Sequence, residues 1–282
     1  MELKEFLASK SALAPATIRS YTMHYNTIRR LLQNDIVSTS ESDLVKAIGQ
    51  LSNDNPSNEW TYLNVPIMVR RLFGVSTNAL EHRRDELNQL RDKYILQRKK
   101  EIHQTLPSYE ELHEFLQQLF NAGQWQAYII NYLLLTYGVR NKDLDVVITD
   151  KNALPDNNTN YIIVKNATAD WHINDYKTMS KYGPKKIIIR NKQFMIALHH
   201  IPLYTHLLGL NGKEVSGASL STTIAKKTYK GLGETVYFKV LMNHINNSSN
   251  ALNEVPRLSK SRGTNISTIL KHYHTGVPYS EK

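Results

Sequence analysis

"LLLTYGVRNKDLDVV", residues 133–147, places a full positive charge at the edge of a strongly apolar segment. Three leucines lead towards Gly138-Val139, Arg140 follows, and the chain becomes apolar again at Leu144. One interpretation is a helix end, where a cation meets exposed carbonyl groups and the negative end of the helix dipole. The other is that Arg140 points into a site that holds an anion. The rest of the sequence bears on this choice.

The composition excludes several classes of protein. The chain has 282 residues, of which 41% are hydrophobic, which suits one or two globular domains. It has no apolar run of about 18 residues, so no membrane-spanning segment is expected. Acidic residues and lysines interrupt the first residues, which therefore do not resemble a secretory signal. Cysteine is absent, which excludes disulfides and thiolate metal sites and predicts an intracellular location.

The positive charge of the chain is unevenly distributed. The net charge is +10, and residues 177–271 contain 15 lysines and arginines against three acidic residues. A polyanion is the natural partner for such a segment, with nucleic acid first. The alternative is a soluble basic protein whose charges form a solvated surface.

The periodicity of the sequence predicts two domains. Residues 1–105 have apolar residues at helical spacing, as in "ATIRSYTMHYNTIRRLL" (16–32). A break follows at Leu106-Pro107, and Ser108 with Glu111 predicts a capping box for the next helix. The predicted division is therefore a helical domain at 1–105 and a second domain at 106–282.

The second domain combines helices with a small sheet. Strands are predicted at "DNNTNYIIVK" (156–165), "WHINDYK" (171–177) and "KKIIIRN" (185–191). From Phe194 onward, including "FMIALHHIPLYTHLL", the pattern is helical again. The predicted fold class is mainly α, with a small antiparallel β-sheet in the C-terminal domain.

The familiar catalytic and cofactor motifs are missing. There is no P-loop, no G-x-G-x-x-G and no H-E-x-x-H, and none of the eleven histidines has metal-ligand spacing with a carboxylate partner. We therefore expect no cofactor, no metal and no small-molecule substrate. What remains is an ordered set of cations followed by a tyrosine, namely Arg140, Lys177, Lys239, Arg262 and Tyr273.

This order, and the motifs that contain it, resemble the tyrosine recombinase (phage-type integrase) family. "LLLTYGVRNKDL" is similar to the family's first arginine box, with Asp143-Leu144 where Glu-Leu is usual. The segment around Lys177 is similar to the family's β-hairpin lysine region, in which Lys181 is a rival to Lys177. "ISTILKHYHTG" resembles the terminal motif that carries the nucleophile, Tyr273. The helical first domain resembles the core-binding domain of the family.

The second box of the family departs from its usual His-x-x-Arg. The matching segment "VYFKVLMNH" has Val236 at the histidine position and Lys239 at the arginine position, 34 residues before Tyr273. Arg262, 11 residues before Tyr273, stands at the place of the family's later His or Trp. Positive charge is kept at both positions, but Lys239 lacks the fork of a guanidinium. The substitutions suggest a divergent viral or mobile-element branch, located in cytoplasm or nucleoid, or in a host nucleus or virus factory.

The resemblance implies a site-specific recombinase or integrase that acts on double-stranded DNA as a homotetramer on paired sites. Attack on a phosphodiester builds negative charge, which preset cations such as Arg140, Lys239 and Arg262 stabilise. Tyr273 is the expected nucleophile of a 3′-phosphotyrosyl intermediate, with Tyr279 as the other tyrosine in the tail. Lys177 is expected to donate a proton to the leaving 5′ oxygen.

Two other functions remain open at this stage. One is a catalytically impaired DNA-binding protein of the same fold, with a packaging or regulatory role, which the altered second box favours. The other is a type IB topoisomerase-like enzyme that relaxes DNA by the same chemistry.

Overall fold

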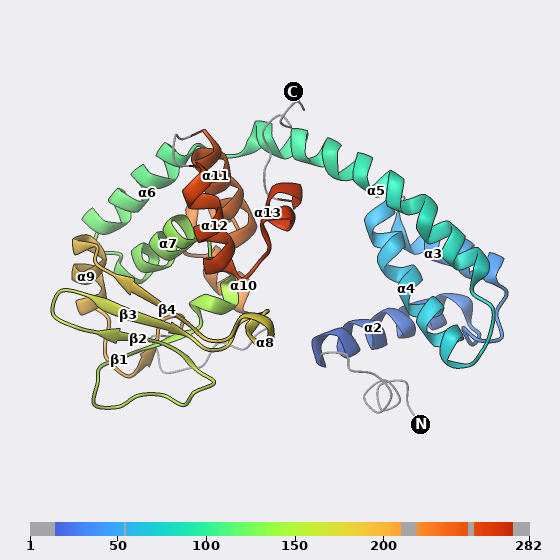
Figure 1. Cartoon of the computed structure of the whole chain (residues 1–282), viewed down its shortest axis with the longest axis horizontal. Coiled ribbons are helices and arrows are strands. Elements are labelled where there is room, and N and C mark those ends of the chain that lie inside the picture. The colour runs from blue at the N-terminus through green and yellow to red at the C-terminus, as the bar shows by residue number, and fades with distance from the viewer. Residues whose placement is uncertain (1–14, 54, 210–218, 248–250, 273–282) are drawn as a thin grey trace. The chain divides into compact units, whose positions relative to one another are not determined.

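The computed structural model of the chain describes residues 15–53, 55–209, 219–247 and 251–272. The chain divides into two compact units, residues 1–100 and 101–282 (Figure 1). The division falls inside one continuous helix, α5, which runs from Asn78 to Thr105. The boundary predicted after residue 105 lies at the end of this helix, whereas the two units divide between residues 100 and 101. No helix in the described ranges is both long and apolar enough to cross a membrane.

The first unit is helical, as the periodicity predicts. Its elements are α2 (Pro15–Leu32), α3 (Glu41–Ser52), α4 (Pro56–Leu72) and the greater part of α5. Side chains of Ser40 and Asn55 cap the N-termini of α3 and α4 by accepting hydrogen bonds from backbone N–H groups. Ile28, Leu63 and Leu87 belong to a buried cluster to which all these helices contribute. The unit therefore has a hydrophobic core of its own.

The second unit contains helices and a sheet. Its helical elements are α6 (Tyr109–Asn121), α7 (Trp125–Tyr137), the 3₁₀ turn η1 (Asn141–Leu144), α8 (Met179–Tyr182), α9 (Lys192–His199), α10 (Leu220–Ala225), η2 (Tyr229–Gly231), α11 (Glu234–Asn246), α12 (Ala251–Arg262) and α13 (Ile266–His272). Its strands are β1 (Val146–Thr149), β2 (Asn160–Val164), β3 (Ala169–Ile173), β4 (Lys185–Ile189) and β5 (Thr205–His206). The predicted capping box of α6 is confirmed, because Ser108 and Glu111 bond each other's backbone N–H groups.

The described residues form one five-stranded sheet in the order β4-β3-β2-β1-β5. The three predicted strands, β2, β3 and β4, pair antiparallel as expected, but β1 pairs with β2 in parallel, so the whole sheet is mixed. Sequence periodicity missed β1 and β5, which are only four and two residues long. The helix predicted from Phe194 through residue 208 ends at His199, and the chain passes Pro202 before β5. A proline cannot donate the backbone hydrogen bond that a continuing helix needs.

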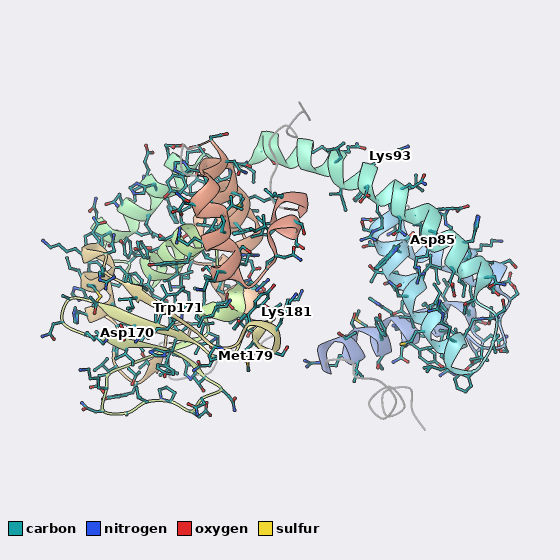
Figure 2. All side chains as sticks on the ribbon, viewed as in Figure 1. Asp85, Lys93, Asp170, Trp171, Met179 and Lys181 are labelled. Atoms are coloured by element: carbon teal, nitrogen blue, oxygen red, sulfur yellow. The ribbon has the colours of Figure 1, made fainter. Side chains whose placement is uncertain are left out.

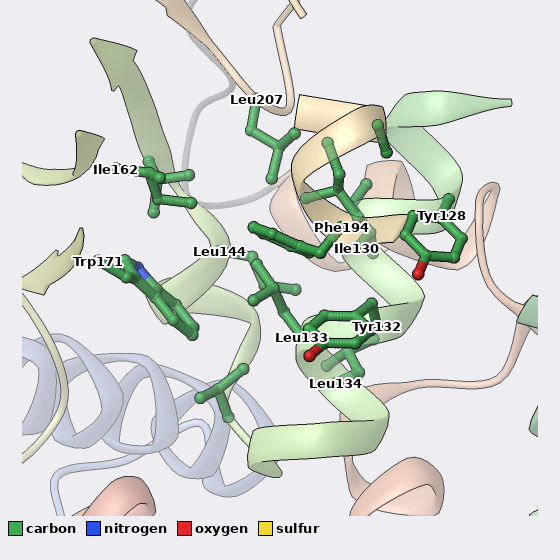
Figure 3. Packing of buried hydrophobic residues seen from close by; sticks show 14 of the residues in the cluster. Tyr128, Ile130, Tyr132, Leu133, Leu134, Leu144, Ile162, Trp171, Phe194 and Leu207 are labelled. Atoms are coloured by element: carbon green, nitrogen blue, oxygen red, sulfur yellow. The ribbon is translucent and has the colours of Figure 1, made fainter. Parts of the chain in front are cut away.

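The core of the second unit lies between one face of the sheet and α7 (Figures 1 and 3). Ile162 of β2 is opposite Trp171 of β3, so both side chains point to the same face. In Figure 3 these two residues face Leu144 and Phe194. α7 is apolar on all sides because it also packs against α6, α9 and α11. The "LLL" segment that begins the first box is therefore the centre of this unit.

α7 ends at Gly138, which adopts a left-handed conformation with φ of 61° and ψ of 30°. Its backbone N–H donates to the carbonyl of Leu134, which closes the helix. A Cβ atom at Gly138 would lie 2.5 Å from Cδ2 and 2.7 Å from Cε2 of Phe238 on α11. Only glycine allows both the turn and this approach to α11.

We expect Gly138→Ala to lower the free energy of unfolding by about 3 kcal/mol, since it adds left-handed strain to overpacking. Gly233→Ala is the matched control in the same unit, because Gly233 has φ of −80° and nothing within 4 Å of an added Cβ. Its effect should be about 1 kcal/mol or less. Urea unfolding of the full chain measures both changes. Equal losses for the two variants would contradict the close packing of Gly138 against Phe238.

Candidate active site

Arg140 reaches from the end of α7 to the turn between α12 and α13. Its Nη1 donates to the carbonyl oxygen of Arg262 at 2.5 Å, and its Nη2 donates to Thr264 Oγ1 at 2.7 Å. Its backbone N–H donates to Asp143 Oδ2 at 3.0 Å. The guanidinium therefore joins two segments that lie more than 120 residues apart in the sequence. This arrangement differs from a helix cap, in which the cation meets the carbonyls of its own helix.

Arg262 is brought to the same place, but its guanidinium is buried. Only 1% of the residue is exposed, and Nη1 donates to the carbonyls of Gly138 at 2.5 Å and Val139 at 3.3 Å. Its Nη2 lies 3.2 Å from Glu234 Oε1, and its Cζ lies 4.1 Å from the centre of the Phe238 ring. All of these contacts are to protein groups. Arg262 therefore links the residues after α7 to Glu234 and Phe238.

The lysine that enters this site is Lys185, at the start of β4. Its Nζ donates to the carbonyl of Ser261 at 2.9 Å and lies 3.6 Å from the centre of the Tyr176 ring. Burial lowers the pKa of Lys185 to about 8. The positive charge of Arg140 lowers this pKa further, whereas the charge of Asp143 raises it. Such a displaced pKa beside other charges is typical of functional sites.

Sequence analysis missed Lys185 in favour of Lys177 and Lys181, both of which are exposed. Lys177 lies in the turn after β3, and Lys181 lies on α8 (Figure 2). The alternation of β4 contains the signal that could have found Lys185. Residues 185, 187 and 189 share the face of the sheet that packs on the core, so the first lysine of "KKIII" must point inward. Lys186, its neighbour, points to the other face and is exposed.

The α12–α13 turn packs closely against Thr178 and Lys185 because Gly263, at its centre, has no side chain. Gly263 has φ of 61°, and a Cβ there would lie 2.6 Å from Thr178 Oγ1 and 2.9 Å from Lys185 Nζ. Thr178 Oγ1 also donates to the carbonyl of Gly263 at 2.8 Å. The turn is therefore held by the β3–β4 connection on one side and by Arg140 on the other.

Two carboxyl groups lie among these cations. Asp143 is 1% exposed, and its burial raises the pKa of its carboxyl. The backbone N–H of Arg140 and the charges of Arg140 and Lys185 lower this pKa, but burial has the larger effect. Its Oδ1 has no hydrogen-bond partner among the described residues. Glu234, at the start of α11, pairs with Arg262. Arg140, Lys185 and Arg262 thus lie among two carboxyl groups, and Glu234 is already paired with Arg262.

The sequence analysis also named Lys239, Tyr273 and Tyr279. Lys239 lies on α11 and is only 9% exposed, so it is not part of a solvated helix face. Tyr273 and Tyr279 lie outside the described residues. Tyr273 is nevertheless the next residue after His272, where α13 ends.

Among the described residues, no group of three or more His, Asp or Glu side chains is placed to hold a metal ion.

A second cationic surface lies on α2 in the first unit. Arg19, Thr22, Met23, Asn26 and Arg30 line one hollow on this helix. The helix contains no acidic residue, and Met23 is 58% exposed. Arginines suit phosphates, while asparagine, threonine and apolar groups suit base edges. The surface thus combines two guanidinium groups with hydroxyl, amide and apolar groups.

The depressed pKa of Lys185 makes stability depend on pH in a known direction. Between about pH 8 and the ordinary lysine pKa of about 10.4, the unfolded chain binds more protons at this residue than the folded chain. The free energy of unfolding should therefore rise with pH through this window, relative to a Lys185→Met variant that lacks the group. Urea unfolding of both proteins at pH 7 and pH 9.5 measures the difference. Parallel pH dependence in the two proteins would show that Lys185 is not buried as described.

Comparisons with known proteins show a distant likeness to a solved structure. No family model and no curated protein matches the sequence. Among solved structures, the crystal structure of XerA recombinase aligns with 97% of this chain and 91% of its own, at 9% sequence identity and a TM-score of 0.38. At that TM-score the alignment assigns no role to any residue of this chain.

Proposed function

We propose that this chain breaks and rejoins strands of duplex DNA through a 3′-phosphotyrosyl intermediate, with Tyr273 as the nucleophile. One observation carries the proposal. Arg140 and Lys185, from separate elements, both bind the turn that leads into α13, and Tyr273 directly follows α13. A cluster of cations beside a helix that a tyrosine directly follows in the sequence is the arrangement that this chemistry requires.

The residues of this cluster divide the chemistry between them. The Tyr273 phenol releases its proton to solvent as its oxygen bonds to phosphorus, the bond from phosphorus to the 5′ oxygen breaks, and the leaving oxygen takes up a proton. Arg140 stabilises the charge that builds on the phosphate oxygens, with Lys239 as a further cation. Lys185, rather than Lys177, donates the proton, because its pKa of about 8 suits transfer near neutral pH. Attack by a 5′ hydroxyl on the phosphotyrosine reverses the step and requires no outside energy source.

Duplex DNA is the proposed partner of both units. The hollow on α2 and the surplus of positive charge in the second unit supply phosphate contacts. A homotetramer on paired sites follows from the family resemblance and remains part of the proposal. A site-specific recombinase or integrase is the function class that unites these features.

One observation favours a second candidate, a DNA-binding protein without cleavage activity. The Arg262 guanidinium is 1% exposed and is bonded to protein acceptors, so one of the cations expected at the phosphate does not face DNA. Such a protein would bind duplexes and form no covalent adduct.

Trapping on nicked DNA tests the proposed nucleophile. A pool of nicked duplexes of random sequence allows the short 5′-hydroxyl fragment to diffuse away, so that the adduct accumulates. We expect a covalent adduct whose modified peptide contains Tyr273. Tyr273→Phe should abolish the adduct, while the matched Tyr279→Phe should leave it intact. Tight DNA binding with no adduct under any condition would support the second candidate instead.

Salt dependence tests the proposed DNA surface. With six phosphate contacts, the affinity for duplex DNA should fall by about a thousandfold between 50 and 200 mM salt, because bound cations release condensed counterions. The double variant Arg19→Ala/Arg30→Ala should reduce the slope of log K against log salt by about 2, which is about one unit for each lost contact. An unchanged slope would remove α2 from the DNA interface.

A further inference from the structure

The ion pair between Glu234 and Arg262 contacts the backbone on both sides of Arg140. We propose that these two residues are positioning residues, which fix the Arg140 guanidinium without touching DNA. The proposal rests on the function proposed above, in which Arg140 holds the reacting phosphate. It is carried by the contacts that the pair makes on both sides of Arg140.

Glu234 holds the residue that follows Arg140. Its Oε2 accepts a short hydrogen bond from the backbone N–H of Asn141, and its Oε1 receives Arg262 Nη2 at 3.2 Å. The Glu234 side chain is 20% exposed and lies in the first turn of α11. One carboxylate therefore connects the start of η1 to the end of α12.

Arg262 holds the residues that precede Arg140. Its Nη1 donates to the carbonyls of Gly138 and Val139, which lie beyond the end of α7 and need donors from outside that helix. The carbonyl of Arg262 in turn accepts from Arg140 Nη1. Arg262 thus determines both where the Arg140 backbone lies and where its side chain ends.

Stability alone does not account for an ion pair at this position. Removing two charges from water costs about as much as their attraction returns, and apolar side chains of similar volume often replace such pairs without loss. Phe238 already packs on this turn: its ring lies 4.1 Å from the Arg262 Cζ and closes against Gly138. What the pair adds is a fixed geometry for residues 138 to 141. A displacement of about 1 Å in a catalytic group can cost about a hundredfold in rate.

The main test is the separation of DNA binding from the cleavage step. Glu234→Gln keeps the size of the side chain and loses its charge. We expect the single-turnover rate of adduct formation, measured with saturating nicked duplex, to fall at least tenfold, while the dissociation constant for DNA changes less than twofold. The matched control is Glu254→Gln, because Glu254 pairs with Arg257 at 2.6 Å on the exposed side of α12. Its cleavage rate should stay within twofold of the wild type.

Hydrogen exchange supplies a readout that does not depend on activity. In Glu234→Gln, the backbone amides of residues 138–142 should exchange at least tenfold faster than in the wild type, because the Asn141 N–H loses its charged acceptor. Glu254→Gln should leave them unchanged. Arg262→Lys is the second variant; a lysine keeps the charge but cannot bridge Gly138 and Glu234 at once. It should reproduce both effects.

Three outcomes bear on the positioning role of Glu234 and Arg262. Normal cleavage and normal exchange in both Glu234→Gln and Arg262→Lys would overturn the positioning role. Equal losses of DNA binding, thermal stability and cleavage would show a purely structural role and would also overturn it. A wild-type protein that forms no adduct would refute the proposed function instead, and the exchange of residues 138–142 would then decide whether the pair fixes this turn.

Discussion

The hydrogen bonds from the Arg140 guanidinium to the α12–α13 turn are the constraint on which the second unit depends. They connect the end of the most buried helix, α7, to the last helices of the described chain. An arginine suits this role because its planar fork bonds two acceptors at once and its charge persists at every working pH. The same fork is the group that we propose for phosphate binding. The proposed phosphate contact would therefore use a side chain that also supports the fold.

The close approach of the two chain segments depends on two glycines. Gly138 allows α7 to end against Phe238, and Gly263 allows the α12–α13 turn to pass beside Lys185. Both have φ of 61°, a conformation that residues with a Cβ rarely adopt. Without a Cβ at either place, charged groups approach backbone carbonyls directly. The site is therefore built largely from backbone acceptors around three cations.

Buried charge is expensive, and this site keeps it only where partners are present. Lys185 is bonded to the carbonyl of Ser261 and covered by the Tyr176 ring, yet its pKa is still depressed by burial. Asp143 shows the converse shift, because burial favours its neutral form. Burial thus moves both groups toward their neutral forms.

The sequence by itself determined the helical first unit, the capping box at Ser108 and the core role of residues 133–135, and it singled out Arg140. These follow from local rules, namely helical spacing, cap residues and an isolated charge beside apolar residues. It did not reveal the parallel pairing of β1 with β2, because pairing depends on contacts between segments distant along the chain. It also did not reveal that Lys185 is partly buried beside the α12–α13 turn while Lys177 is exposed, or that Arg262 is buried against Glu234. Only the tertiary structure decided these points, since burial and charge pairing depend on which surfaces meet when the sheet and the last helices close around α7.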